Sequence, residues 1–146
     1  MPSRARPFLF LAVLLGLGVG LAACGTRKSP TEPTGAPPDP TATFTRVQNE
    51  IFTPSCARSG CHAGAAPQQG MDLSAGRSYG LIVGVKAVES TRPRIAPGSP
   101  DDSYMVSKVK GDATISGSRM PLGGPYLSAD KEQLLVDWVR RGAPND

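Results

Sequence analysis

The chain has 146 residues, of which 39% are hydrophobic and only 5% aromatic, and 16 basic side chains face 12 acidic ones. This length allows one small domain with additional segments. Lysine and arginine do not cluster with interleaved aromatic residues anywhere in the chain, and this argues against a nucleic-acid partner.

The first 23 residues have the layout of an export signal. Arg4 and Arg6 precede an apolar stretch, residues 8–21, that is short for a membrane-spanning helix. The letters LAAC at residues 21–24 then resemble the lipobox of bacterial lipoproteins. That resemblance implies cleavage before Cys24, lipidation of Cys24 and export to the periplasmic face of a membrane. An ordinary signal peptide and an uncleaved anchor are the alternatives.

A tether is expected to follow the lipidated cysteine. Gly25, and not Asp, directly follows Cys24. By resemblance to the Gram-negative sorting rule, this favours the outer membrane. Residues 24–42 are rich in Pro, Thr and Gly and show no apolar period, so we expect a lipid-anchored, disordered tether. Loss of Arg4 and Arg6 with the signal would leave a net charge of +2. Residues 43–146 are then the single domain.

Three helices are predicted before the last helix of this domain. A helix is predicted over residues 44–52, where Phe44, Val47 and Ile51 recur on one face. Thr43 and Thr45 are both suitable N-caps, and Pro54 is expected to end the helix. A weaker helix is predicted over about 75–83, and a short one over 103–109 with a buried methionine, Met105.

The last helix has the clearest signals in the chain. Ser128 is a suitable N-cap, and Gly142 is expected to stop the helix before Pro144. Between these ends lies an apolar stripe made of Leu134, Leu135, Trp138 and Val139. No run of alternating strands is present. The expected fold class is therefore mostly α, with long loops rich in glycine and proline.

The domain has little apolar mass for its size. Only six aromatic residues remain after the signal is removed, and the loops between the helices are long. A domain of this length usually needs a larger core or a staple to offset its chain entropy. We therefore expect that something other than side chains fills part of the core.

The most informative stretch is CARSGCH, residues 56–62, which contains Cys56, Cys61 and the only histidine, His62. In an exported protein, a disulfide between the two cysteines is the simplest interpretation. A zinc or copper site is a second one, although a fourth ligand is missing. A thiol nucleophile would need its base to lie against it, and residues adjacent in the chain rarely do so.

The motif also resembles the haem-attachment site of c-type cytochromes, C-x-x-C-H, with a gap of four residues instead of two. The resemblance extends over residues 44–144, with a helix before the motif, a methionine-bearing loop and a closing helix. It implies a small cytochrome c-like helical domain whose loops wrap one covalent haem c. In that family the two cysteines, here Cys56 and Cys61, form thioethers, and the histidine, here His62, ligates iron.

The same resemblance assigns the second axial iron ligand to a methionine on a loop. Met120, in the loop GSRMPLGGP, fits this role, whereas Met71 lies too near His62 in sequence to reach the opposite face easily. Candidates to line the haem pocket complete the expected site: Phe52, Leu73, Pro97, Tyr104, Leu122 and Trp138. Of these, Trp138 is expected to belong to the helix–helix core rather than to contact the ligand.

The resemblance implies an electron carrier, tethered to a membrane by its lipid anchor, that exchanges electrons with redox partner proteins in the periplasm or envelope. An enzyme is not expected, because two axial ligands leave no open iron site. Two alternatives remain. One is a peroxidase-like haem enzyme in which Met120 does not bind iron. The other is a non-haem lipoprotein with a Cys56–Cys61 disulfide that acts as an interaction module.

Overall fold

The computed structural model describes residues 36–146, which form one compact unit. Cys24, the predicted signal and most of the predicted tether lie outside the described residues. None of the helices in the described part of the chain is both long and apolar enough to cross a bilayer. In chain order the helical segments are α1 (Phe44–Val47), η1 (Gln48–Cys56), η2 (Gln68–Gly70), α2 (Ser78–Ile82), α3 (Tyr104–Lys110) and α4 (Ala129–Arg140).

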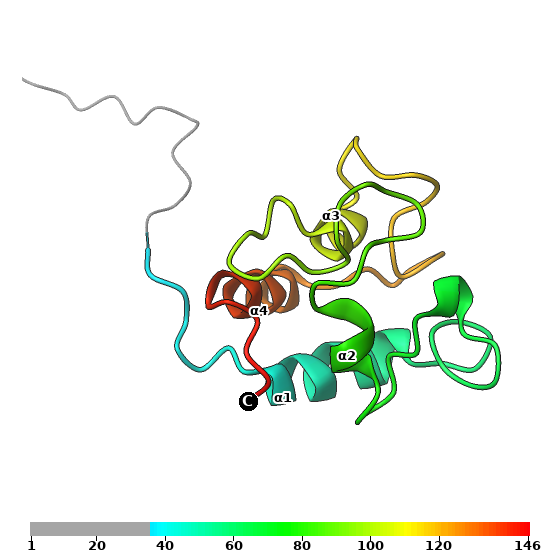
Figure 1. Cartoon of the computed structure of the whole chain (residues 1–146), viewed down its shortest axis with the longest axis horizontal. Coiled ribbons are helices and arrows are strands. Elements are labelled where there is room, and N and C mark those ends of the chain that lie inside the picture. The colour runs from blue at the N-terminus through cyan, green and yellow to red at the C-terminus, as the bar shows by residue number, and fades with distance from the viewer. Residues whose placement is uncertain (1–35) are drawn as a thin grey trace, which may run out of the picture. The chain divides into compact units, whose positions relative to one another are not determined.

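The predicted fold class, mostly α, is confirmed for residues 36–146. Extended backbone there forms only isolated bridges, such as those between Val83 and Ile95 and between Lys86 and Pro93, and no strand. In Figure 1, α1 and α2 lie along one side of the domain and α3 along the other. Helix α4 contacts both α1 and α3 and lies between them (Figure 1).

The first helix is longer than predicted, because it passes through Pro54. Thr43 caps its start, and the Thr43 hydroxyl accepts a hydrogen bond from the Arg46 N–H at 3.2 Å. Helix α1 continues directly into η1, a π-helical segment that ends at Cys56. A proline ring clashes with the carbonyl four residues earlier in an α-helix, but a π-helical turn is wider and bonds five residues apart. The prediction that Pro54 ends the helix was therefore wrong.

Helix α4 has the predicted limits and supplies the centre of the core. Its N-cap is Ser128, and Gly142 follows its end with a φ of 97°, a left-handed conformation that favours glycine. Trp138 is fully buried, and its ring lies 5.5 Å from that of Phe44 in α1. The Trp138 indole N–H also donates to the carbonyl of Pro144 at 2.9 Å. The first and last helices are thus joined through aromatic packing.

The two ends of the described chain are tied together. The Phe44 N–H donates to the carboxylate of Asp146 at 2.8 Å, and the Arg141 guanidinium donates to the carbonyl of Ala42. Ala42 itself is fully buried. The last residues of the predicted tether, 39–42, therefore contact the domain.

Candidate functional site

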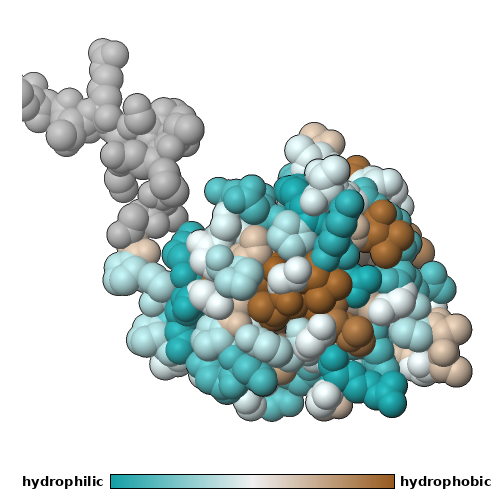
Figure 2. All heavy atoms as spheres, viewed as in Figure 1, coloured by the Kyte–Doolittle hydropathy of each residue, from teal (hydrophilic) through white to brown (hydrophobic). Residues whose placement is uncertain are grey.

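A cavity of about 650 Å³ lies between the CARSGCH loop on one side and α3 with the loop that carries Met120 on the other. This volume is typical of sites for small molecules and cofactors, which range over about 300–1,000 Å³. Most of its lining is apolar. Figure 2 shows an apolar area, hollowed and framed by hydrophilic residues, on one face of the domain.

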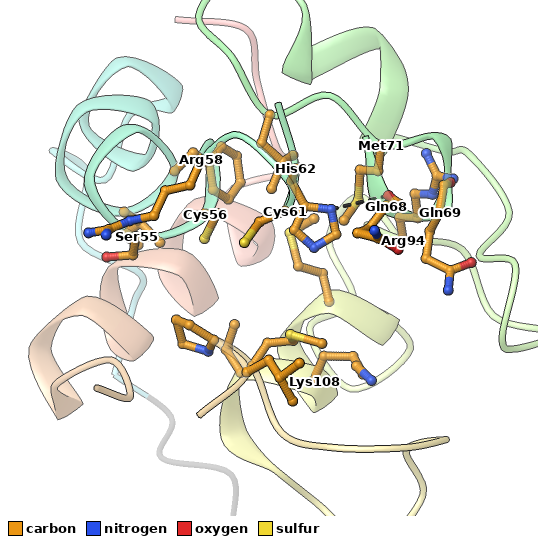
Figure 3. A pocket seen from close by; sticks show the side chains of 18 of the residues that line it. Ser55, Cys56, Arg58, Cys61, His62, Gln68, Gln69, Met71, Arg94 and Lys108 are labelled. Carbon is orange, nitrogen blue, oxygen red and sulfur yellow. Dashed lines mark hydrogen bonds between the residues drawn. The ribbon is translucent and has the colours of Figure 1, made fainter. Parts of the chain in front are cut away.

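The four-residue gap between the cysteines forms a tight turn. Cys56 is the last residue of η1, and the chain then reverses through Gly60, which has a φ of 80°. The Cys61 N–H donates to the Arg58 carbonyl at 3.0 Å, and the His62 N–H donates to the Cys56 carbonyl at 3.2 Å. The wider gap therefore brings His62 back beside Cys56, and both cysteines line the cavity (Figure 3).

The two thiols are unbonded and differ in environment. Cys56 is half-buried and Cys61 is exposed. Burial, with a smaller contribution from the nearby Cys61, raises the pKa of the Cys56 thiol to about 11. Cys56 is therefore a protonated thiol at neutral pH, and it is less reactive than an ordinary cysteine.

The imidazole of His62 is held in one tautomer. Its Nδ1 lies 3.2 Å from the carbonyl oxygen of Gln68. A carbonyl only accepts, so Nδ1 carries the proton and Nε2 keeps its lone pair. Burial lowers the pKa of His62, although hydrogen bonds to the backbone at Gln68 and Met71 oppose this shift. A neutral imidazole with a free Nε2 and a fixed Nδ1–H is the form that ligates a metal ion.

Met120 lies on the wall opposite His62. Its N–H donates to the carbonyl of Lys108 at 2.9 Å, and Lys108 lies across the cavity from Cys61 and His62 (Figure 3). Met71 lies on the His62 side of the cavity, as its distance in sequence suggested (Figure 3). Met105 is buried in α3, as predicted, and it also lines the cavity.

Four of the six predicted lining residues line this cavity: Phe52, Leu73, Tyr104 and Leu122. Pro97 and Trp138 do not line this cavity, and for Trp138 the expectation that it belongs to the helix–helix core is confirmed. Pro97 is exposed in a loop, and Trp138 packs between α1 and α4 instead.

Several groups in the cavity wall were not predicted from the sequence. The Gln68 carbonyl is a backbone atom, so no residue type identifies it. Arg94 lines the cavity and is only 8% exposed. The sequence around Arg94 contains no motif that indicates a site. Its guanidinium donates to the carbonyls of Leu81 at 2.7 Å and Gln69 at 2.6 Å. Burial lowers the pKa of Arg94.

Within residues 36–146, no three side chains of His, Cys, Asp or Glu converge in the arrangement of a metal site. The thiols, imidazole and thioethers around the cavity are instead distributed over its two walls. Comparisons of the chain with protein families, with curated proteins and with solved structures find no match.

Proposed function

We propose that this chain is a membrane-tethered periplasmic electron carrier that binds one covalent haem c. One observation carries the proposal. Two thiols and an imidazole with a free Nε2 belong to one wall of a largely apolar cavity of cofactor size, and a methionine belongs to the opposite wall. This donor set suits haem: thiols to form thioethers, and nitrogen and thioether sulfur as axial ligands.

Each residue has a distinct role in this proposal. Cys56 and Cys61 would hold the haem covalently, one at the end of η1 and the other across the turn. His62 would present Nε2 to the iron, and the Gln68 carbonyl would keep its ring oriented. Met120 would supply the second axial ligand.

A bound haem supplies one-electron exchange at iron. His62 and Met120 would tune its potential, because one imidazole and one thioether ligand give a higher potential than two imidazoles. If both side chains bound the iron, water and peroxide would find no open site there. The residues thus favour electron transfer over turnover, and no second histidine is available as a proton donor or acceptor.

The setting of the carrier is part of the same proposal. Lipidation at Cys24 would anchor the chain to a membrane, with the outer membrane favoured by Gly25. The part of the predicted tether that precedes residue 39 would hold the domain away from the bilayer surface, because residues 39–42 contact the domain. Redox partner proteins in the periplasm or envelope would then exchange electrons with the haem.

The first test is a reduced pyridine-haemochrome spectrum of the full chain, expressed with haem-c maturation machinery and denatured before measurement. We expect the band position of a haem with both vinyl groups saturated. A band at the single-thioether position would show that one cysteine is unused. Absence of covalent haem, with Cys56 and Cys61 found oxidised, would contradict the proposal and favour the disulfide-bonded interaction module.

Two variants accompany this spectrum. We expect Cys61→Ala and His62→Ala to abolish accumulation of the haem-loaded protein. An equally abundant His62→Ala protein with an unchanged spectrum of the native state would contradict the role of His62 as an iron ligand.

A further inference from the structure

Arg94 is a buried cation in the wall of the cavity, and no carboxylate of the described chain neutralises it. It is 8% exposed, and none of the ion pairs among residues 36–146 includes it. By contrast, Lys108 in the same cavity lies 3.4 Å from the carboxylate of Glu89. A buried charge without a counterion is costly, and proteins usually pair it.

The hydrogen bonds of Arg94 to the backbone use only part of the donors of its guanidinium. Arg94 uses one N–H on each terminal nitrogen for the carbonyls of Leu81 and Gln69. A guanidinium has five N–H groups, so donors remain for another acceptor. Two carbonyl acceptors could also be joined by a neutral amide, which would avoid the cost of the charge.

Arg94 lies at the end of the cavity that is away from Cys56. Figure 3 shows Arg94 with Gln68 and Gln69 beyond His62, whereas Cys56 and Arg58 lie at the other end. Arg94 is near enough to His62 to contribute to the lowered pKa of that imidazole. The cavity therefore has a thiol end, where the arginine Arg58 is exposed, and, past the imidazole, an end where the positive charge of Arg94 is buried without a carboxylate beside it.

We propose that Arg94 binds a carboxylate of the molecule that occupies the cavity, so that the site selects a macrocycle with free carboxylates over its neutral analogue. The inference rests on the proposed function, because haem carries two propionates. It goes further by assigning a cationic contact to one residue outside the haem-attachment motif.

The test uses the full-length apoprotein with reduced thiols and two iron-free probes, mesoporphyrin IX and its dimethyl ester. Mesoporphyrin has ethyl groups in place of vinyls, so Cys56 and Cys61 cannot form thioethers. Without iron, His62 and Met120 add no ligand bonds. The difference in dissociation constant between the acid and the ester, followed by absorption, then reports the contribution of the carboxylates alone.

We expect the wild-type chain to bind the acid about tenfold or more tightly than the ester, as for a hydrogen bond between charged groups. Arg94→Gln should reduce this preference to within about twofold while it binds the ester normally. Arg94→Lys should retain part of the preference. Arg77→Gln is the matched control, because it removes the same charge from a side chain that is 71% exposed and outside the cavity.

Three results would overturn the inference. The first is equal binding of acid and ester by the wild-type chain. The second is an unchanged preference in Arg94→Gln. The third is a parallel loss of both probes in Arg94→Gln, which would assign Arg94 only to joining the Gln69 and Leu81 backbones. Failure of the wild-type chain to bind either probe would count against the haem pocket itself, and the haemochrome spectrum checks that independently.

Discussion

The two cysteines of the motif are chemically unequal before any cofactor is attached. Cys56 lies at the end of a helix and has a pKa of about 11, whereas Cys61 lies in the exposed turn. The thiolate is the reactive form of cysteine. At pH 8 only on the order of one Cys56 side chain in a thousand is ionised. The difference should appear in any reaction that consumes the thiols.

We predict that iodoacetamide alkylates Cys61 before Cys56 in the reduced apoprotein at pH 8. Mass spectrometry of the digested chain would follow the two peptides separately. The rate at Cys56 should rise as the pH approaches 11, because the thiolate fraction rises through that range. Equal rates at pH 8 would show that burial does not protect Cys56.

Met120 should control the iron without holding the haem. We predict that Met120→Ala retains covalent haem, lowers the reduction potential and lets exogenous imidazole bind, because the proposed thioether ligand is lost. Potentiometry and imidazole titration measure these effects. Met71→Leu is the matched control, since it changes a cavity-lining thioether on the His62 side. An unchanged potential in Met120→Ala would assign the sixth ligand to another residue.

At the scale of elements, the loop that carries Met120 is fixed by the residue before it. The Arg119 guanidinium donates to the carbonyl of Val109 in α3 at 2.7 Å and to Glu132 in α4 at 2.6 Å. It also lies 4.3 Å from the centre of the Tyr126 ring. One side chain therefore joins the loop to two helices, and Met120 follows it directly.

We predict that Arg119→Ala lowers the free energy of unfolding by about 1–2 kcal/mol, because partly exposed charged hydrogen bonds contribute amounts of this order. Urea unfolding of the apoprotein measures this loss. In the haem-loaded protein the same variant should bind imidazole more readily than wild type, since Met120 is less firmly held. Arg119→Lys keeps the charge and should show smaller effects; an Arg119→Ala protein as stable as wild type would contradict the role of this side chain.

At the scale of the whole molecule, a packed helical core lies beside an apolar cavity that opens on one face of the domain. The helices α1 and α4 pack through Phe44 and Trp138 on one side. A cavity of about 650 Å³ occupies the other side. Empty apolar volume lowers stability, because the side chains that line it lose contacts.

We predict that the chain produced without haem unfolds at a distinctly lower temperature than the haem-loaded chain. A loss of about 2 kcal/mol would lower the midpoint by roughly 8–16 °C in a domain of this size. Circular dichroism of the same chain, with and without maturation machinery during expression, measures the difference. Equal midpoints would mean that the cavity does not need an occupant for stability.

Local signals in the sequence were sufficient for the helices but not for the cavity wall. Thr43, Ser128 and Gly142 mark helix ends through nearest neighbours alone, so their roles could be predicted. The prediction for Pro54 was wrong because the proline rule applies to α-helical turns, whereas η1 is π-helical. Arg94 belongs to the cavity only because distant segments fold together, and no spacing in the chain records that.

For the site, the residue types of the motif predicted which atoms could act, and the fold added how they are oriented. Cys56, Cys61, His62 and Met120 were predicted through the resemblance to c-type cytochromes, and all four line one cavity. The hydrogen bond that fixes the His62 tautomer comes from a backbone carbonyl, which every residue possesses. Such contacts depend on the path of the chain and cannot be read from side-chain identities.

That backbone contact also determines how the protein can change over time. Because the acceptor for His62 is the main-chain oxygen at position 68, replacing the Gln68 side chain leaves the acceptor in place. Inserting or deleting a residue between 62 and 68 would move it. Residues 63 and 65–67 should therefore tolerate substitution as long as the number of residues stays constant, whereas Gly64 has a φ of 94° that favours glycine. The hydrogen bond that orients the imidazole and makes it a stronger electron donor would then depend on the length of this loop and not on its side chains.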